Sequence, residues 1–181
     1  MKELSLDDLK LALSECAALS GETEFVVVGS LAIVGAHPFA PASLRVSQDI
    51  DLFFLKGATL ERNRAIYERF GPDSEFAELH DFYIEPVGDW TVMTSLPGWR
   101  ERLVKVEASG GAIGWCLSPL DIAYNKAEAG REKDIVYLAE LFRCGIVHPS
   151  EIKAAMDTTG TATETAVAIN ARVQEAMGRV D

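Results

Sequence analysis

The sequence predicts a mixed α/β fold, in which a sheet flanked by helices is followed by an all-helical C-terminal segment. Short β-branched and aromatic runs alternate with helical patterns as far as residue 117, whereas only helical patterns follow from Ser118. The 181 residues suffice for one ordinary domain with a small appendage. We therefore expect an α/β core over residues 1–117 and a helical segment over residues 118–181 that packs on it.

In the first part of the chain, apolar spacing and turn residues predict the elements. A capping pair, Ser5 and Asp8, precedes apolar residues at helical spacing, and Val26–Val28 form a β-branched run. Gly71–Pro72 ends a further helical pattern. The predicted elements are a helix over 6–17, a strand over 25–28, a short helix over 31–36, a loop over 37–43, a strand over 49–55, a helix over 58–70 and a strand over 82–87.

Glycine and proline punctuate the stretch that follows, which predicts two short strands over 103–106 and 112–117. The texture changes at Ser118–Pro119, because a capping serine and a first-turn proline together signal the start of a helix. The helical segment is predicted to contain helices over 120–129, 131–144, 150–156 and 164–177, with a loop rich in threonine and glycine over 158–165.

Composition excludes several classes of protein. The chain has 17 basic and 28 acidic residues, a formal net charge of −11, which disfavours non-specific binding to nucleic acid or to anionic membranes. The three cysteines are widely spaced without a Cys-x-x-Cys motif, so neither a disulfide scaffold nor a cysteine zinc site is indicated. We expect a cytoplasmic protein without membrane contact, because neither a signal peptide nor a long apolar run is present.

The sharpest chemical feature is the pair of carboxylates in Asp49-Ile50-Asp51. Residues at i and i+2 of a strand project from the same face, so these two carboxylates lie close together and repel each other unless a cation lies between them. Mg²⁺ is a hard ion that binds carboxylate and phosphate oxygens. The pair therefore favours a magnesium site, although an Asp-x-Asp on a solvated strand face also occurs by chance.

The turn Gly29–Ser30 complements the carboxylates. A glycine directly after a strand lets a phosphate group approach the backbone, and the hydroxyl of Ser30 with the amides of the following helix can donate hydrogen bonds to it. A lone Gly-Ser is by itself only a turn, so the prediction depends on its place before the Asp-x-Asp strand.

With these residues the sequence resembles the nucleotidyltransferase superfamily, whose members share the DNA polymerase β-like core. The residues that carry the resemblance are Gly29–Ser30, Asp49 and Asp51, with Glu85 as the matching third carboxylate. The likeness covers residues 25–142 and is closest to the AbiEii-type toxin and related uncharacterised bacterial nucleotidyltransferases. It rests also on an arginine and a hydroxyl residue before Asp-x-Asp, Arg45 and Ser47, and on two later helical motifs, Asp121–Lys126 and Ala129–Asp134.

The resemblance implies which residues hold the metal. Asp49, Asp51 and Glu85 would bind two Mg²⁺ ions, and Glu85 would also draw the proton from an attacking hydroxyl. Glu85 lies on the polar side of its predicted strand, but Asp81 and Asp89 are nearby rivals for the third position. The choice among these three carboxylates stays open on the sequence alone.

The resemblance also implies nucleotide contacts by basic residues. Lys126 and Lys133 would contact the triphosphate, and Arg45 would bind near it. Lys126 and Lys133 share one helix face if the helix continues through Gly130, whereas a break at Gly130 assigns Lys133 to the next helix. Acidic residues are interleaved with these lysines, so a solvated salt-bridge face is the competing interpretation.

The expected function is a Mg²⁺-dependent transfer of a nucleoside monophosphate from a nucleoside triphosphate to an acceptor hydroxyl. The acceptor is open among an RNA end, a protein and a small molecule. If the toxin likeness holds, a cognate antitoxin protein is the expected partner. The alternative is a catalytically inert module that retains the nucleotidyltransferase fold for binding.

Overall fold

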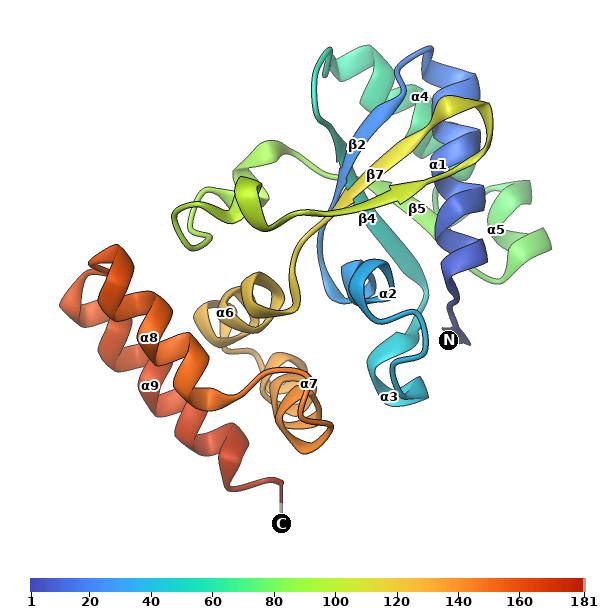
Figure 1. Cartoon of the computed structure of the whole chain (residues 1–181). Helices are drawn as coiled ribbons and strands as arrows, with labels where there is room; N and C mark the ends of the chain where they lie inside the picture. Colours follow the sequence, from blue (N-terminus) through green and yellow to red (C-terminus); the bar gives the residue numbers. More distant parts are fainter. Residues whose placement is uncertain (181) are drawn as a thin grey trace. The chain divides into compact units, whose positions relative to one another are not determined.

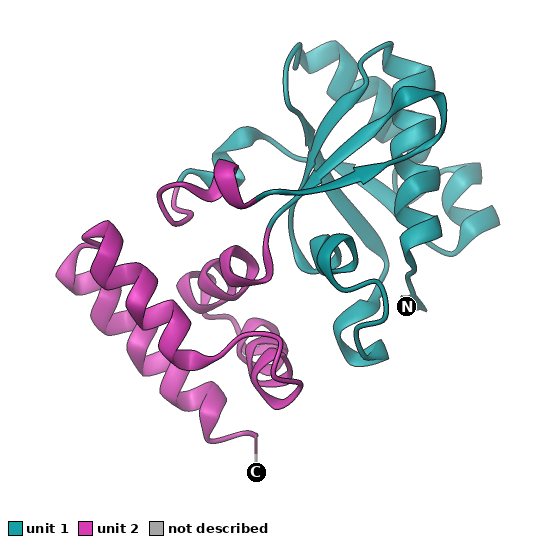
Figure 2. Cartoon of the chain, in the orientation of Figure 1, with its two compact units in different colours: residues 1–93, 103–117 teal, residues 94–102, 118–181 magenta. Residues whose placement is uncertain are grey.

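The computed structural model describes residues 1–180, which divide into two compact units (Figures 1 and 2). We call residues 1–93 with 103–117 the sheet unit, and residues 94–102 with those from 118 onward the helical unit. The segment 94–102 thus groups with the helices, although the sequence had placed the boundary at residue 117. The predicted organisation, a core over residues 1–117 with a helical segment over residues 118–181 packed on it, stays a prediction.

A five-stranded mixed sheet forms the centre of the sheet unit, and its strand order is β5-β4-β2-β7-β6. The pairs β4–β5 and β2–β7 are parallel, whereas β2–β4 and β6–β7 are antiparallel. The strands of this sheet are β2 (Glu24–Val27), β4 (Asp49–Phe54), β5 (Tyr83–Pro86), β6 (Val104–Glu107) and β7 (Ile113–Cys116). A separate antiparallel pair joins β1 (Lys2–Glu3) to β3 (Val46–Ser47). The mixed α/β class predicted from the sequence is confirmed.

Helices surround this sheet (Figure 1). They are α1 (Leu6–Ser20), α2 (Ile33–Ala36), α3 (Ala42–Arg45), α4 (Leu60–Phe70) and α5 (Glu75–His80), with 3₁₀ turns η1 (Ser30–Ala32), η2 (Asp89–Val92) and η4 (Ser109–Gly111). The helix α1 begins at a capping box, in which the Ser5 hydroxyl accepts from the amide of Asp8 and the Asp8 carboxylate accepts from the amide of Ser5.

The two faces of the sheet differ in polarity, and this difference positions the site. One face is apolar: Ile50 and Leu52 of β4 and Ile84 of β5 are fully buried. Gly114 of β7 belongs to the same face, where a Cβ would lie 2.7 Å from Leu13 of α1, so the missing side chain lets this helix pack closely. The alternate residues of β4 and β5 project from the opposite face, which is half-exposed around its carboxylates.

The helical unit contains four α-helices and a 3₁₀ turn among its described residues. They are η3 (Trp99–Arg102), α6 (Pro119–Ala129), α7 (Glu132–Arg143), α8 (Pro149–Thr159) and α9 (Thr163–Met177). Ser118 caps α6 as predicted, and its hydroxyl accepts from the amide of Asp121. Gly130 ends α6 in the left-handed conformation, with φ of 64°. This break assigns Lys133 to α7 and decides the question that the sequence left open.

Several elements differ from the sequence prediction. The helix expected over 31–36 is a 3₁₀ turn followed by one α-helical turn. The helix α5 was missed, because its six residues are too few to reveal a period. The expected loop over 37–43 contains the start of α3. The loop expected over 158–165 shrinks to residues 160–162, because α8 continues through Thr159 and α9 begins at Thr163.

Candidate active site

The two aspartates of β4 lie on the half-exposed face of the sheet, as the period of a strand requires. Asp49 and Asp51 are each partly accessible, whereas Ile50 between them is buried on the opposite face. The hydroxyl of Ser47 donates to Oδ1 of Asp49 at 2.6 Å, which restrains the rotation of that carboxylate. The apolar face thus fixes the strand, and the strand fixes the direction of both carboxylates.

Glu85 comes to the same face from the neighbouring strand. In the parallel β4–β5 register, Glu85 is the Cα partner of Asp51, and Tyr83 is the partner of Asp49. Burial and then the negative charge of Asp49 raise the pKa of Glu85 above its ordinary value. Three carboxylates on adjacent rows of one sheet face therefore make an acidic surface, which we call the carboxylate face (Asp49, Asp51 and Glu85).

The rivals for the third position do not share this register. Asp81 is exposed at the end of α5 with φ of 60°, and Asp89 is exposed at the start of η2. Neither belongs to β5. The geometry therefore favours Glu85 as the third member, and its metal role stays a prediction.

Tyr83 was not singled out by the sequence analysis, but all three residues of the carboxylate face affect the pKa of its phenol. Burial raises the pKa of its phenol, and the charges of Asp49, Glu85 and Asp51 raise that pKa further. The only signal available in the sequence was its position two residues before Glu85, which predicts the same side of the strand. The phenol therefore stays neutral to a higher pH than an exposed tyrosine does.

Gly29 lies directly against the carboxylate face. Its φ is 68°, and a Cβ built there would overlap Oδ2 of Asp51. The amide of Val28 donates to the carbonyl of Asp51 at 2.9 Å, which holds the turn beside the strand. A glycine is required here for two reasons, the left-handed backbone and the close approach of a carboxylate. Ser30 follows as the first residue of η1, whose brevity leaves little helix dipole to attract an anion.

Arg45 makes structural contacts. Its guanidinium donates to the carbonyls of Ala40 at 2.6 Å and Leu4 at 3.1 Å, and it pairs with the carboxylate of Glu3. Only 15% of the Arg45 side chain is exposed. These bonds tie β1 to the chain around β3, so a contact with nucleotide would require Arg45 to change partners.

The two lysines of the helical unit have different environments. Nζ of Lys126 lies 3.0 Å from Oδ1 of Asp134 and 5.0 Å from the ring centroid of Tyr137, and 13% of its side chain is exposed. Lys133 is exposed on α7. Lys126 is therefore committed to an ion pair, and Lys133 is accessible.

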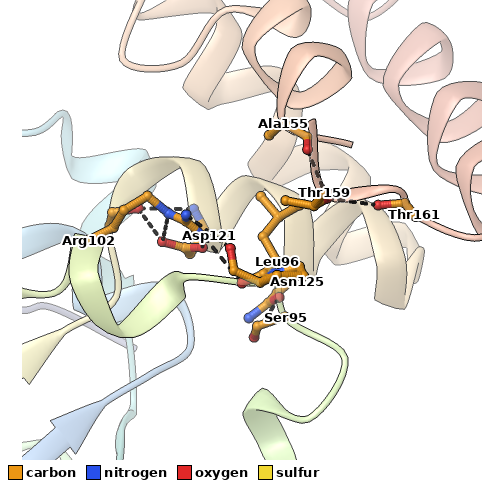
Figure 3. Close-up of polar contacts among 10 residues, drawn as sticks. Ser95, Leu96, Arg102, Asp121, Asn125, Ala155, Thr159 and Thr161 are labelled. Carbon is orange, nitrogen blue, oxygen red and sulfur yellow. Dashed lines mark hydrogen bonds and ion pairs between the residues drawn. The ribbon is translucent and has the colours of Figure 1, made fainter. Parts of the chain in front are cut away.

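Two fully buried carboxylates in the helical unit were not recognised as buried from the sequence. Asp134 accepts from Lys126 and from Nε of Arg131 at 2.5 Å; burial acts to raise its pKa, but these bonds and charges lower it overall. Asp121 accepts from Arg102 at 2.6 and 3.0 Å, as Figure 3 shows, and from the Ser118 hydroxyl at 2.5 Å. Their bonds satisfy the buried charges, so both acids are structural.

The carboxylate face fits a hard divalent cation in its donor chemistry. All three members offer oxygen ligands. Because residue 29 is a glycine, no side chain from that position covers the Asp51 carboxylate. Within residues 1–180, however, no group of three or more His, Cys, Asp or Glu side chains is close enough to hold a metal ion. Mg²⁺ usually takes only one or two carboxylates and completes its shell with water and substrate phosphates, so the Asp49–Asp51 pair suits it.

Comparison with known proteins places the chain in a family. A model described as "Nucleotidyltransferase of unknown function (DUF6036)" matches residues 6–159. The chain belongs to this nucleotidyltransferase family. The match runs from the first residue of α1 to the last residue of α8, so it includes the carboxylate face, Gly29–Ser30 and both lysines. No curated protein and no solved structure matches the chain.

The family match confirms the predicted membership of the nucleotidyltransferase superfamily, and the closeness to AbiEii-type toxins stays a prediction. Across the described residues, no helix of this nucleotidyltransferase-family chain is long and apolar enough to cross a membrane.

Proposed function

We propose that the carboxylate face is the active site of a Mg²⁺-dependent nucleotidyltransferase, which moves a nucleoside monophosphate from a nucleoside triphosphate to an acceptor hydroxyl. The observation that carries the proposal is the parallel register between β4 and β5, in which Glu85 is the partner of Asp51. This register brings Glu85 beside Asp51 on one face of the sheet, although the two residues are 34 positions apart in the chain. The family match supports the reaction class.

Each residue has a distinct task in this reaction. Asp49 and Asp51 would hold Mg²⁺, which when bound stabilises charge on the phosphates. Ser47 keeps the Asp49 carboxylate in position through its 2.6 Å hydrogen bond. The acceptor oxygen attacks the α-phosphorus, the bond to the bridging oxygen breaks, and pyrophosphate leaves. Glu85 takes the acceptor's proton.

Gly29 and Ser30 would receive the β- and γ-phosphates. The missing side chain at Gly29 lets a phosphate approach the backbone beside Asp51. Lys133 is available for a phosphate because it is exposed, whereas Lys126 and Arg45 would first have to exchange the partners described above. We therefore rank Lys133 before Lys126 and Arg45 as a nucleotide contact.

The wider biological role rests on the sequence resemblance. A toxin function and an antitoxin protein as partner are parts of the proposal that follow from the AbiEii-type likeness. The cytoplasmic location is also proposed, on the sequence features described above. The formal charge of −11 argues mildly against a large nucleic-acid acceptor, because phosphate repulsion would have to be overcome by local basic residues. A protein or small-molecule hydroxyl is the acceptor that the charge favours.

An inert binding module is the second candidate, and the lack of a ready-made three-ligand metal group within residues 1–180 is the observation that favours it. Label transfer distinguishes the two. Wild-type protein with Mg²⁺ and each of the four α-³²P nucleoside triphosphates is expected to label an acceptor in a cell extract. Glu85→Gln should abolish labelling while nucleotide affinity, measured by calorimetry, changes little. Asp81→Asn is the matched control and should label normally. Nucleotide binding without any labelling would instead establish the inert module.

A further inference from the structure

A cavity of about 290 Å³ lies within the helical unit, apart from the carboxylate face in the chain. It is formed by the segment 94–97, the helix α6 and the 160–162 turn between α8 and α9. Six of its lining side chains carry hydroxyl groups, namely Thr94, Ser95, Tyr124, Thr159, Thr161 and Thr165. We call it the hydroxyl cavity. Nothing in the proposed transferase reaction uses it.

Two hydroxyls of this cavity donate their protons to the protein, so their oxygens are left to accept hydrogen bonds. Ser95 donates its proton to Oδ1 of Asn125 at 3.1 Å, and Thr159 donates to the carbonyl of Ala155 at 2.8 Å (Figure 3). Thr159 also lies 3.3 Å from the hydroxyl of Thr161. A hydroxyl has one proton but two lone pairs, so an oxygen that has donated to protein retains acceptor capacity. A ligand rich in hydrogen-bond donors therefore matches these oxygens.

Tyr124 supplies an unused polar group. Only 4% of this residue is exposed, and its hydroxyl has no hydrogen-bond partner within residues 1–180. Asn63 Oδ1 is the one side-chain oxygen or nitrogen in that part of the chain that is both inaccessible and unpartnered, so the Tyr124 hydroxyl must reach solvent. Because Tyr124 lines the hydroxyl cavity, a ligand there would meet a buried ring whose solvent-accessible hydroxyl has no protein partner and is available to it.

The electrostatic character of the cavity is set by Glu128. This carboxylate is the only acidic group in the lining, and neither Lys, Arg nor His joins it there. No described residue forms an ion pair or a hydrogen bond with the Glu128 carboxylate; Arg172 bonds only to its backbone carbonyl. A half-buried carboxylate without a cation favours a positively charged ligand, because the opposite charge replaces the stabilisation by water that the carboxylate loses on burial.

We propose that the hydroxyl cavity binds a small organic cation, specifically a primary ammonium carried on a polyhydroxylated body. Glu128 pairs with the ammonium group. The threonine, serine and tyrosine oxygens accept from the ligand's hydroxyls, and the apolar ring of Tyr124 packs against its carbon chain. This inference does not depend on transferase activity, because the residues involved all belong to the helical unit.

Two probes that differ only in charge test the proposal. D-glucamine carries an ammonium group where sorbitol carries a hydroxyl, and the rest of the two molecules is alike. In a titration of the ¹⁵N-labelled full chain, followed by amide spectra in phosphate buffer, glucamine should shift the signals of Gly160, Thr161 and Ala162. Its affinity should exceed that of sorbitol about tenfold, the usual gain of a charge-assisted contact.

Variants identify the residues responsible. Glu128→Gln should lower glucamine affinity about tenfold, to the level of sorbitol, whereas Asp157→Asn should leave it unchanged. Asp157 is the matched control, because it is exposed on α8 and outside the cavity lining. Tyr124→Phe should weaken both probes about fivefold while the dispersed amide spectrum is retained. Equal affinity for the two probes, full glucamine affinity in Glu128→Gln, or no shift at residues 160–162 would each overturn the proposal.

Discussion

Glu85 is held in an environment that disfavours its charge, and the stability of the protein should report this. Its pKa is raised by burial and by the charge of Asp49, so the folded state binds more protons than the unfolded state between the two pKa values. This carboxylate therefore makes stability fall as the pH rises from the unfolded value, about 4.3, through the higher folded value. The charged form of Glu85 therefore lowers the stability of the folded protein, which is not expected of a glutamate with a purely structural role.

The first prediction concerns this pH dependence. Glu85→Gln removes the charge, so at pH 7 the variant should be more stable than wild type, and the difference should vanish near pH 4, where Glu85 is protonated in both states. Thermal melts across this range measure the difference. Glu78→Gln is the control, because Glu78 is exposed and should give no such trend. A Glu85→Gln protein less stable than wild type at pH 7 would contradict the conclusion that burial and the charge of Asp49 destabilise the charged Glu85 side chain.

Gly29 provides the second prediction, and Gly110 provides its control. Both glycines have positive φ, but Gly110 has ψ of 14°, the left-handed helical conformation, in which an alanine costs about 1–2 kcal/mol. Gly29 has ψ of −162°, a conformation that almost only glycine adopts, so an alanine there should be more strained. A Cβ at Gly110 meets nothing within 4 Å, whereas one at Gly29 overlaps the Asp51 carboxylate. Gly29→Ala should therefore lose more stability than Gly110→Ala, as chemical denaturation would show.

The same pair of variants tests the nucleotide site. Gly29→Ala should also lose most nucleotide affinity in the presence of Mg²⁺, because the new methyl would displace the Asp51 carboxylate that is proposed to hold the metal ion. Gly110→Ala should bind as wild type does. Equal affinities in calorimetry would mean that Gly29–Ser30 is only a turn.

At the scale of whole elements, the sequence predicted the long, periodic and capped segments well. The capping box at Ser5 and the proline start of α6 are local signals, so both helices were recognised. The alternation in β4 likewise predicted the face of Asp49 and Asp51. The two-residue strands β1 and β3 left no period to detect.

The site itself was predictable only in part, because some of it depends on pairing between distant segments. The strand parity of Glu85 was readable from the sequence, but its pairing with Asp51 depends on the register of two strands that a long connection separates. The partners of Arg45 were not readable, and for Lys126 the salt-bridge interpretation indicated an acidic partner but not which acid or that it would be buried. Their contacts, with Leu4 and Asp134, are tertiary, and motif position says nothing about such partners.

The third prediction tests whether Lys126 is structural. It connects the helices α6 and α7 through Asp134, whose side chain is fully buried. Lys126→Met removes one partner of this acid and should cost about 2 kcal/mol of unfolding free energy, less than for an isolated buried pair because Arg131 remains. Lys133→Met removes an equal charge from an exposed position and should change stability by less than about 0.5 kcal/mol. Urea unfolding of both variants measures the difference, and equal midpoints would contradict the assigned ion pair.

For the molecule as a whole, charge and family point to the same kind of chemistry. The family match includes the carboxylate face, and the net charge of −11 attracts divalent cations to the protein in general. That general attraction would concentrate Mg²⁺ weakly everywhere, so a specific site must be shown by location rather than by binding alone.

Paramagnetic broadening by Mn²⁺ tests that location most directly. Mn²⁺ replaces Mg²⁺ and broadens the amide signals of residues near it. With α,β-methylene-ATP or the matching analogue of another nucleoside, small amounts of Mn²⁺ should first broaden Gly29, Asp49, Asp51 and Glu85, and Asp51→Asn should abolish the effect. Sharp signals for these four residues, with broadening elsewhere or none, would contradict the assignment of the carboxylate face as the metal and nucleotide site.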